Sequence, residues 1–137
     1  MADILQNEEV EMKREKLSDN FYRDEFACKC GCGRAAINLY LVECLQRVRD
    51  IVDVPIIINS GYRCPAHNKA IKGSQQSRHM LGLAADIRAH SEYYPDEIAT
   101  VIEKYILEIT DGFIGLGVYE TFVHFDVLRA KDKRWTA

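Results

Sequence analysis

The residues best suited to chemistry gather in one stretch, residues 60–86, which reads SGYRCPAHNKAIKGSQQSRHMLGLAAD. Two arginines, a cysteine, two of the chain's four histidines and an aspartate occur there among glycines, serines and alanines. His79 and Asp86 are seven residues apart, and Gly82 and two alanines lie between them. Small side chains let two backbone segments approach closely, so the imidazole and the carboxylate can converge on one point. We expect a metal ion at that point.

The third ligand should be another histidine, distant in sequence. A catalytic zinc ion commonly has two imidazoles and one carboxylate as protein ligands, with a fourth position open to water. His124, in the apolar run FVHFD, is the natural choice, although an isolated histidine in an apolar strand is more often a hydrogen-bonded core residue. His67, in CPAHN, is expected near the cleft, where it supports a ligand or contacts substrate. His90 lies in a polar turn and is expected to be solvated.

The pattern of apolar side chains predicts the elements that carry these residues. Spacings of three and four predict a helix over 38–53 and a second over 95–109, with Pro65 opening a short helix between them. The runs PIIIN and LAADIRA predict buried strands, and FIGLGVY and TFVHFDVL predict a strand pair separated by Glu120. The predicted class is α+β, with helices packed against a small, mainly antiparallel sheet.

Composition limits the partners. A chain of 137 residues, 47% of them apolar, is the size of one domain. With 18 basic and 21 acidic residues it has no positive surplus for nucleic acid, and it has no apolar run long enough to cross a membrane. The charged N-terminus lacks the apolar segment of a signal peptide, so we expect synthesis in the cytoplasm. We divide the chain into a charged arm or helix over 1–18 and one domain over 19–137.

The cysteines allow two interpretations. Five cysteines form an odd set without a secretion signal, which disfavours a complete disulfide framework. Cys28, Cys30 and Cys32 occur in CKCGCG with one residue between neighbours, whereas zinc knuckles have two to four. A structural zinc held by these residues with Cys64 is one interpretation; the spacing favours the other, reduced thiols in a glycine-containing turn. Cys44 falls near the apolar stripe of the 38–53 helix and is expected to pack as a small hydrophobic residue.

Three segments in order resemble one known family. SGYRCPAHN, SRHMLGLAAD and GLGVYETFVHFD are similar to the zinc peptidases grouped around the D-Ala-D-Ala carboxypeptidases, which share their fold with hedgehog signalling domains. The specific signature is SxHxxGxAxD, and the resemblance runs over about residues 21–135. FACKCGCG and RAKDKRW look like a small carboxypeptidase-like branch met in phages and prophages. The resemblance implies a hedgehog/DD-peptidase-like fold and one catalytic Zn²⁺ bound by His79, Asp86 and His124.

The resemblance also implies roles around the metal. The guanidinium of Arg63 corresponds to the group that polarises the scissile carbonyl and stabilises the oxyanion. Ser77 corresponds to a residue that hydrogen-bonds substrate, and Tyr62 and His67 complete the expected substrate contacts. A surface arginine in an ion pair, and a serine that simply ends a loop, are the plainer alternatives.

The general base departs from the family pattern. Many relatives have ExxH, with the catalytic glutamate three residues before the last zinc histidine, but Thr121 stands there. Glu120 and Asp126 share the face of His124 on an extended strand, so either could carry a proton from water to the leaving amine. A bulge before Phe122 would favour Glu120, whose ordinary alternative is a solvated turn residue.

These inferences predict a zinc metallopeptidase that hydrolyses a bond in peptidoglycan, as a D,D-carboxypeptidase or an endopeptidase. Acting without a signal peptide, it would reach the cell wall as a phage lysis enzyme released by holin or on a virion, or serve as a bacterial housekeeping enzyme. Two other classes compete with this prediction. One is a zinc-binding structural or interaction domain without catalysis, which the missing ExxH supports. The other is a cysteine-based redox protein.

Overall fold

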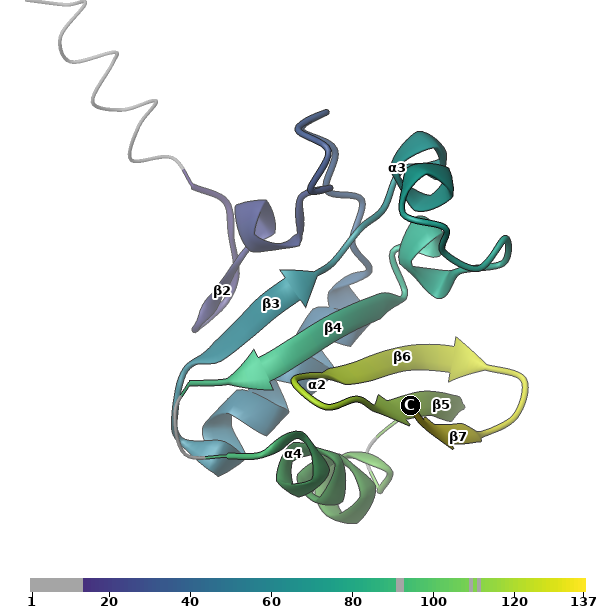
Figure 1. The fold of residues 1–137 in the computed structure, drawn as a ribbon. Helices are drawn as coiled ribbons and strands as arrows, with labels where there is room; N and C mark the ends of the chain where they lie inside the picture. The colour runs from purple at the N-terminus through teal and green to yellow at the C-terminus, as the bar shows by residue number, and fades with distance from the viewer. Residues whose placement is uncertain (1–13, 91–92, 109, 111) are drawn as a thin grey trace, which may run out of the picture.

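The fold is built on a five-stranded sheet in the order β3-β4-β6-β5-β7 (Figure 1). The structure is a computed structural model that describes residues 14–90, 93–108, 110 and 112–137. The strands are β3 Ile56–Ser60, β4 Ala84–Ala89, β5 Phe113–Val118, β6 Val123–Arg129 and β7 Lys133–Thr136. All neighbouring strands are antiparallel except β5 and β7, which are parallel. The predicted α+β class with a mainly antiparallel sheet is therefore confirmed.

Helices cover one face of this sheet (Figure 1). They are α2 Leu39–Val52 and α4 Pro95–Val101, and α4 continues as a π-helix over Ile102–Ile106. The side chain of Asn38 caps α2 by accepting a hydrogen bond from the N–H of Tyr40 (2.8 Å), as predicted. The short helix α3, Pro65–Ala70, follows β3. Both long helices and the short one are confirmed, and residues 109 and 111 lie outside the described residues.

The segment before α2 is anchored by aromatic residues. Two short strands, β1 Lys16–Ser18 and β2 Phe21–Tyr22, pair antiparallel, and a 3-10 helix, η1 Arg23–Phe26, follows them. Phe21 and Phe26 are fully buried with ring centroids 6.0 Å apart. Residues 1–13 of the proposed arm lie outside the described residues. Within the described ranges, no helix has the length and apolar character needed to span a membrane.

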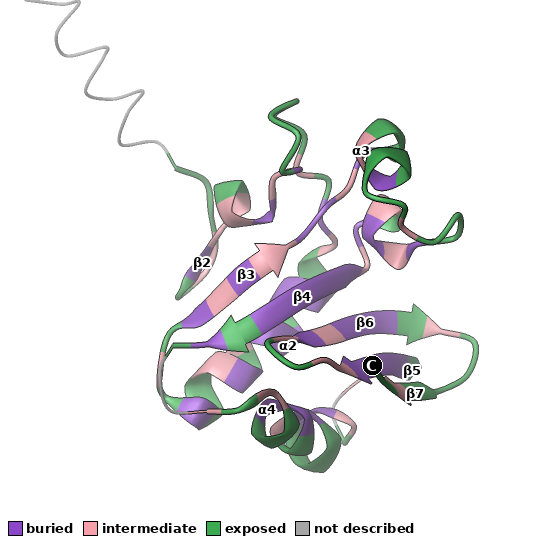
Figure 2. Ribbon diagram, viewed as in Figure 1, coloured by how far each residue is buried: buried purple, intermediate pink, exposed green. Residues whose placement is uncertain are grey.

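The two faces of the sheet differ in chemistry. In β4 and β6, the side chains of Ile87 and Phe125 belong to the core cluster that includes the helices. Because side chains alternate along a strand, Asp86, His124 and Asp126 lie on the opposite face. Figure 2 shows β4 and β6 as largely buried strands in the middle of the sheet. The helix-covered face thus forms the core, and the second face carries the polar residues singled out in the sequence.

Candidate active site

Strand register brings two of the predicted ligands together. Asp86 in β4 is the direct antiparallel partner of His124 in β6, and Gly117 in β5 is the partner of His124 on its other side. Directly opposed residues have Cβ atoms about 4.5–5.5 Å apart, so their side chains meet. The two ligands, separated by 38 positions in the chain, are therefore adjacent because of sheet pairing.

The third predicted ligand comes from the turn before β4. His79 lies in a 3-10 helix, η2 Arg78–Leu81, which Ser77 caps by accepting a hydrogen bond from the His79 N–H (3.3 Å). Gly82 ends this helix at φ 71°, and a Cβ there would overlap the carbonyl of Ala36. Only glycine satisfies both requirements at low cost. In SxHxxGxAxD, the serine thus caps the 3-10 helix, the histidine is one candidate ligand, and the glycine forms the tight turn. The strand that follows carries the aspartate, which is the second candidate ligand.

The imidazoles are oriented by their outer nitrogens. The carbonyl of Gly61 lies 2.8 Å from Nδ1 of His79, and Oδ2 of Asp126 lies 2.7 Å from Nε2 of His124. Both oxygens are acceptors, and a neutral imidazole has one N–H, so we assign the protons to these two nitrogens. The remaining nitrogens both face Oδ1 of Asp86, at 3.2 Å for His79 Nε2 and 3.0 Å for His124 Nδ1. The lone pairs of these two nitrogens then face the lone pairs of the Asp86 oxygen. A cation bound between the three atoms would accept all of these lone pairs.

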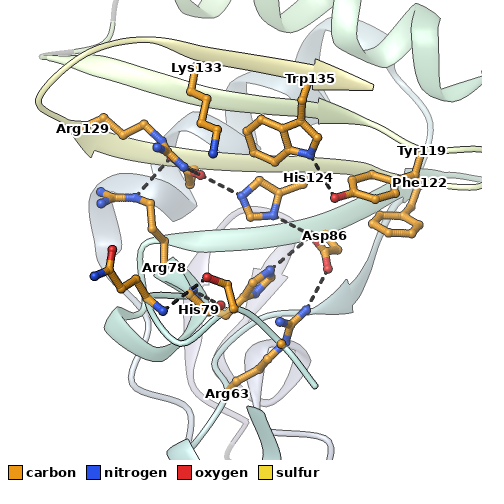
Figure 3. Close-up of a pocket in the computed structure, with 15 residues that line it drawn as sticks. Arg63, Arg78, His79, Asp86, Tyr119, Phe122, His124, Arg129, Lys133 and Trp135 are labelled. Atoms are coloured by element: carbon orange, nitrogen blue, oxygen red, sulfur yellow. Dashed lines mark hydrogen bonds and ion pairs between the residues drawn. The ribbon is translucent and has the colours of Figure 1, made fainter. Parts of the chain in front are cut away.

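The distances fit a zinc ion. A tetrahedron with zinc bonds of about 2.0–2.1 Å has edges of about 3.3 Å, close to the two distances to Asp86 Oδ1. The three atoms all lie within 4.8 Å of one another, and Figure 3 shows the side chains of His79, Asp86 and His124 directed toward a common point. Two imidazoles and a carboxylate, with the outer nitrogens held by a carbonyl and a carboxylate, form a donor set suited to zinc.

Burial and hydrogen bonding set the charges. In the metal-free site, burial disfavours the ionised carboxylate of Asp86, but hydrogen bonds with His124 and His79 outweigh it and hold the pKa of Asp86 well below its usual range. Burial opposes charge on His124 as well, yet hydrogen bonds with Asp126 and Asp86 raise its pKa. The pKa of Asp126 is lowered to about 2, because hydrogen bonds with His124 and Arg129 overcome burial. Both carboxylates are therefore ionised at neutral pH.

Asp126 is fully buried and bound by three cationic or polar side chains. Besides His124, it accepts a hydrogen bond from Nη2 of Arg129 (2.8 Å) and forms an ion pair with Nε of Arg78 (3.3 Å). Gly115 lies beneath it, and a Cβ there would overlap the carboxylate. The oxygens of Asp126 are thus committed to holding His124 and the two arginines.

Arg63 lies on the other side of the ligand carboxylate. Its Nη2 is 3.2 Å from Oδ2 of Asp86, so Asp86 has one oxygen toward the histidines and one toward the guanidinium. Nε of Arg63 donates to the Ser60 hydroxyl (3.2 Å), and Nη1 donates to Oδ1 of the buried Asn68 (3.4 Å). These contacts hold the guanidinium at the wall of the cavity.

The site opens into a cavity of about 530 Å³. One wall is aromatic: the rings of Tyr119 and Phe122 stack with centroids 4.4 Å apart, and Nε1 of Trp135 donates to the Tyr119 hydroxyl (2.9 Å). The Trp135 ring lies 5.1 Å from the ring of His124 and packs over Gly117, where a Cβ would overlap it. The cavity volume falls in the range of small-molecule and peptide sites.

The structure gathers some of the predicted site residues and not others. Arg63, Ser77 and Asp126 line the cavity with the three candidate ligands. Glu120 is exposed in the β5–β6 turn and does not line it. Tyr62 is buried beside Cys28 and Cys64, and His67 lies in α3, so neither lines the cavity.

Sequence reasoning missed several cavity residues. They are Arg78, Tyr119, Phe122, Arg129, Lys133 and Trp135. Arg78 directly precedes His79, which is a local signal. Arg129 has no such signal, because the alternation of side chains along a strand would place it on the face opposite Asp126. In the structure, a register shift in β6, with Leu128 at φ 59°, brings the Arg129 side chain to the same face as Asp126.

Comparison with known proteins agrees with this geometry. Residues 19–126 match the family described as Peptidase M15, and the matched segment contains His79, Asp86 and His124. No curated protein shows a significant match to the chain. The family match covers most of the chain and confirms the resemblance inferred from the SGYR, SxHxxGxAxD and FVHFD segments. The chain belongs to the peptidase M15 family, the zinc peptidases of D-Ala-D-Ala carboxypeptidase type.

Proposed function

We propose that this protein is a zinc-dependent peptidase that hydrolyses a bond in the stem peptide or crosslink of bacterial peptidoglycan. M15 membership makes a zinc-peptidase type of hydrolase and a peptidoglycan peptide the expected class and substrate. The observation that carries the proposal is the His79, Asp86 and His124 triad at the wall of an open cavity. Structural zinc sites use four protein ligands, whereas three ligands beside a cavity leave a position for reacting groups.

The triad would hold the metal through Nε2 of His79, Oδ1 of Asp86 and Nδ1 of His124. Zinc bound there supplies Lewis acidity, which activates water at neutral pH and polarises the scissile carbonyl. Gly61 and Asp126 keep the outer nitrogens protonated and the rings fixed. Such outer contacts typically change metal affinity or activity 10- to 100-fold when removed.

Arg63 would stabilise the negative charge that develops on the carbonyl oxygen. Its guanidinium is already held at the cavity wall by Asp86, Ser60 and Asn68, so it needs no reorganisation when the substrate reacts. A guanidinium also offers several N–H donors, which allows it to keep the Asp86 contact while donating to substrate.

We assign proton transfer to Glu120 and positioning of His124 to Asp126. Asp126 contacts the outer nitrogen of His124, on the side of the ring away from Asp86, and its oxygens are occupied by arginines. Glu120 makes no hydrogen bond or ion pair with any other residue in the described ranges, so its carboxylate is available. The proposal requires its side chain to turn from the exposed turn toward the cavity when substrate binds, because catalytic contacts often form only in the complex.

The charges of the cavity suit a substrate that carries carboxylates. Four cationic residues line it: Arg63, Arg78, Arg129 and Lys133. Arg78 and Arg129 share an ion pair with the single carboxylate of Asp126, and Arg63 pairs with Asp86, whereas Lys133 forms no ion pair with the residues described here. We assign Lys133 to binding a carboxylate of the stem peptide. Ser77, whose oxygen accepts from the His79 N–H, retains its hydroxyl proton to donate to the substrate.

We also propose that the chain reaches the cell wall by holin-dependent release or as part of a phage virion. The similarity of FACKCGCG and RAKDKRW to a phage and prophage branch supports this. Mass spectrometry of purified virions and of the cleared lysate distinguishes the two routes. Presence of the protein only in uninfected, intact cells would contradict both.

The peptidase proposal is tested by digesting defined muropeptides with the purified full-length protein and identifying the products by mass spectrometry. We expect cleavage that a chelator abolishes, that added zinc restores, and that His79→Ala lacks. The mass of the fragments distinguishes carboxypeptidase from endopeptidase cleavage. Stoichiometric zinc in the triad without any product would contradict the proposal and indicate a zinc-binding domain without catalysis.

A further inference from the structure

A second group of potential metal ligands lies outside the peptidase site. Cys28, Cys30 and Cys32 belong to the loop between η1 and α2, and Cys64 is the N-cap residue of α3. Figure 1 shows this loop, in dark blue, at the same end of the molecule as α3. The four sulfur atoms all lie within 4.8 Å of one another. Sheet folding thus brings a cysteine 32 positions further along the chain to the CKCGCG segment.

The distances between the sulfurs fit tetrahedral coordination. Sγ of Cys30 lies 3.4 Å from Sγ of Cys28 and 3.7 Å from Sγ of Cys64. A tetrahedral zinc site with Zn–S bonds of about 2.3 Å has sulfurs about 3.8 Å apart. A disulfide bond is only about 2.05 Å long, and all of these cysteines are free thiols. The arrangement therefore matches a four-thiolate site better than a pair of disulfides.

Two glycines explain how a CxCxC sequence achieves this. Side chains separated by a single residue would point the same way only in an extended strand, but this segment is a turn. Gly31 and Gly33 have φ of 87° and 80°, a conformation that favours glycine. The turn is closed by a hydrogen bond from the Cys28 N–H to the Arg34 carbonyl (2.8 Å). Left-handed glycines after Cys30 and Cys32 re-aim successive thiols to one side, which compensates for the short spacing.

The surroundings favour thiolates. The backbone N–H of Cys64 donates to Sγ of Cys28, and that of His67 donates to Sγ of Cys64, both at 3.4 Å. The guanidinium of Arg34 adds a positive charge beside Cys32 and the cluster. N–H donors and a nearby cation stabilise the negative charge of a metal-thiolate group.

The cysteine-containing part of the loop, residues 28–34, adds no side chain to the main core. Residues 27–38, all of which the structure describes, form neither helix nor strand. Ile37, near the end of this loop, packs in the main core, whereas the buried residues at its cysteine end form a separate small cluster of Cys28, Tyr62 and Cys64. Units with small cores commonly need a metal or disulfides for stability. Cys44, the fifth cysteine, is buried in the main core and explains the odd total.

We infer that Cys28, Cys30, Cys32 and Cys64 bind a second zinc ion, which is structural and distinct from the ion of the peptidase site. Four protein ligands leave no open position, so this ion fastens the loop to the start of α3. The fastened segment, residues 61–64, includes the Gly61 carbonyl that orients His79 and includes Arg63. The second ion therefore also fixes the positions of the Gly61 carbonyl and Arg63, which belong to the peptidase site.

Metal analysis of purified full-length variants tests this inference. We expect two zinc ions per chain in the natural protein and one in Cys30→Ser or Cys32→Ser. Both cysteines are exposed, so their replacement leaves no core cavity. The matched control Cys44→Ala should retain two ions, and His79→Ala should retain the cysteine-bound ion alone. Cobalt substitution should give thiolate charge-transfer absorption in His79→Ala and lose it in Cys32→Ser.

A second measurement needs no variant. In the zinc-loaded protein the exposed thiols of Cys30 and Cys32 should resist alkylation, and trypsin should cut slowly after Lys29 and Arg34. Chelation should expose both the thiols and the cleavage sites. One zinc ion per chain in natural protein and Cys32→Ser alike, or thiols that react equally with and without chelator, would overturn the inference. Iron in place of zinc, or a disulfide within the cluster, would overturn it as well.

Discussion

Replacing Asp126 with asparagine separates a positioning role from proton transfer. The substitution keeps the size of the side chain and removes its charge. Whichever way the amide is turned, its NH₂ group faces donors from His124 or from the arginines, because both carboxylate oxygens accept in the natural protein. The Nε2–H of His124 then loses its anionic acceptor or competes for the one remaining oxygen.

The substitution should weaken zinc binding and lower folding stability, and the contacts of Asp126 indicate how large each effect is. Loss of an outer contact to a metal-bound histidine lowers metal affinity about 10- to 100-fold, equivalent to about 1.4–2.7 kcal/mol. Removing one partner of a buried ion pair costs about 3–5 kcal/mol of folding stability. The lower end applies here, because Arg78 and Arg129 keep 19% and 21% of their side-chain surface in water. A domain with about 5–15 kcal/mol of stability should still fold.

The assay is competition for zinc between the protein and a chromophoric chelator, followed by muropeptide hydrolysis at increasing free zinc. Zinc binding to the triad is identified as the step of the titration curve that is missing in His79→Ala. We expect Asp126→Asn to need about 10- to 100-fold more zinc for half-occupancy, and to regain most activity when the triad is saturated.

Glu120→Gln is the matched control, because it also exchanges a carboxylate for an amide on the same hairpin. We expect unchanged zinc affinity and a loss of kcat of about 10²–10⁴-fold at saturating zinc. The reverse pattern would refute the assignment. If Asp126→Asn binds zinc normally yet stays inactive at saturation, while Glu120→Gln remains active, then Asp126 carries the proton.

Three further predictions concern the cavity. Gly117→Ala places a Cβ against Trp135 and should lower kcat/KM about 10- to 100-fold at normal zinc content, measured by muropeptide kinetics. Arg63→Lys should lower kcat about 10²–10³-fold with zinc still bound, because the fixed guanidinium is lost; an unchanged kcat would remove Arg63 from oxyanion stabilisation. Lys133→Ala should raise KM about tenfold and leave kcat unchanged for substrates with a free carboxylate, and amidated substrates should not respond.

Much of the fold could be predicted because local patterns agree with tertiary packing. The 38–53 helix has both a cap and an apolar stripe, and Asn38 caps it in the structure as expected. The strands carrying Asp86 and His124 were predicted from their apolar runs, and in the structure core and site residues alternate along both, which puts the two ligands on one face once the strands pair. The parallel pairing of β7 with β5 has no such signal, since Lys133–Thr136 is short and mostly polar.

The parts of the site that escaped prediction depend on irregular backbone. Arg129 reaches Asp126 only because β6 shifts register near Leu128. The four cysteines converge because two glycines adopt left-handed conformations in a turn, whereas the one-residue spacing favoured the interpretation as reduced thiols without a metal. The sequence left Glu120 and Asp126 open as the proton carrier, with Glu120 favoured by a bulge before Phe122, and the two arginines that occupy Asp126 are the reason we assign it to positioning.

The central claim is that the triad of His79, Asp86 and His124 binds zinc for peptide hydrolysis. The most direct test titrates zinc into metal-free protein while bound zinc and hydrolysis of a defined muropeptide are measured in the same samples. We expect hydrolysis to rise in proportion to occupancy of the triad, and His124→Ala to show none at any zinc concentration. Full occupancy of the triad with no hydrolysis, or hydrolysis that persists without zinc, would contradict the claim.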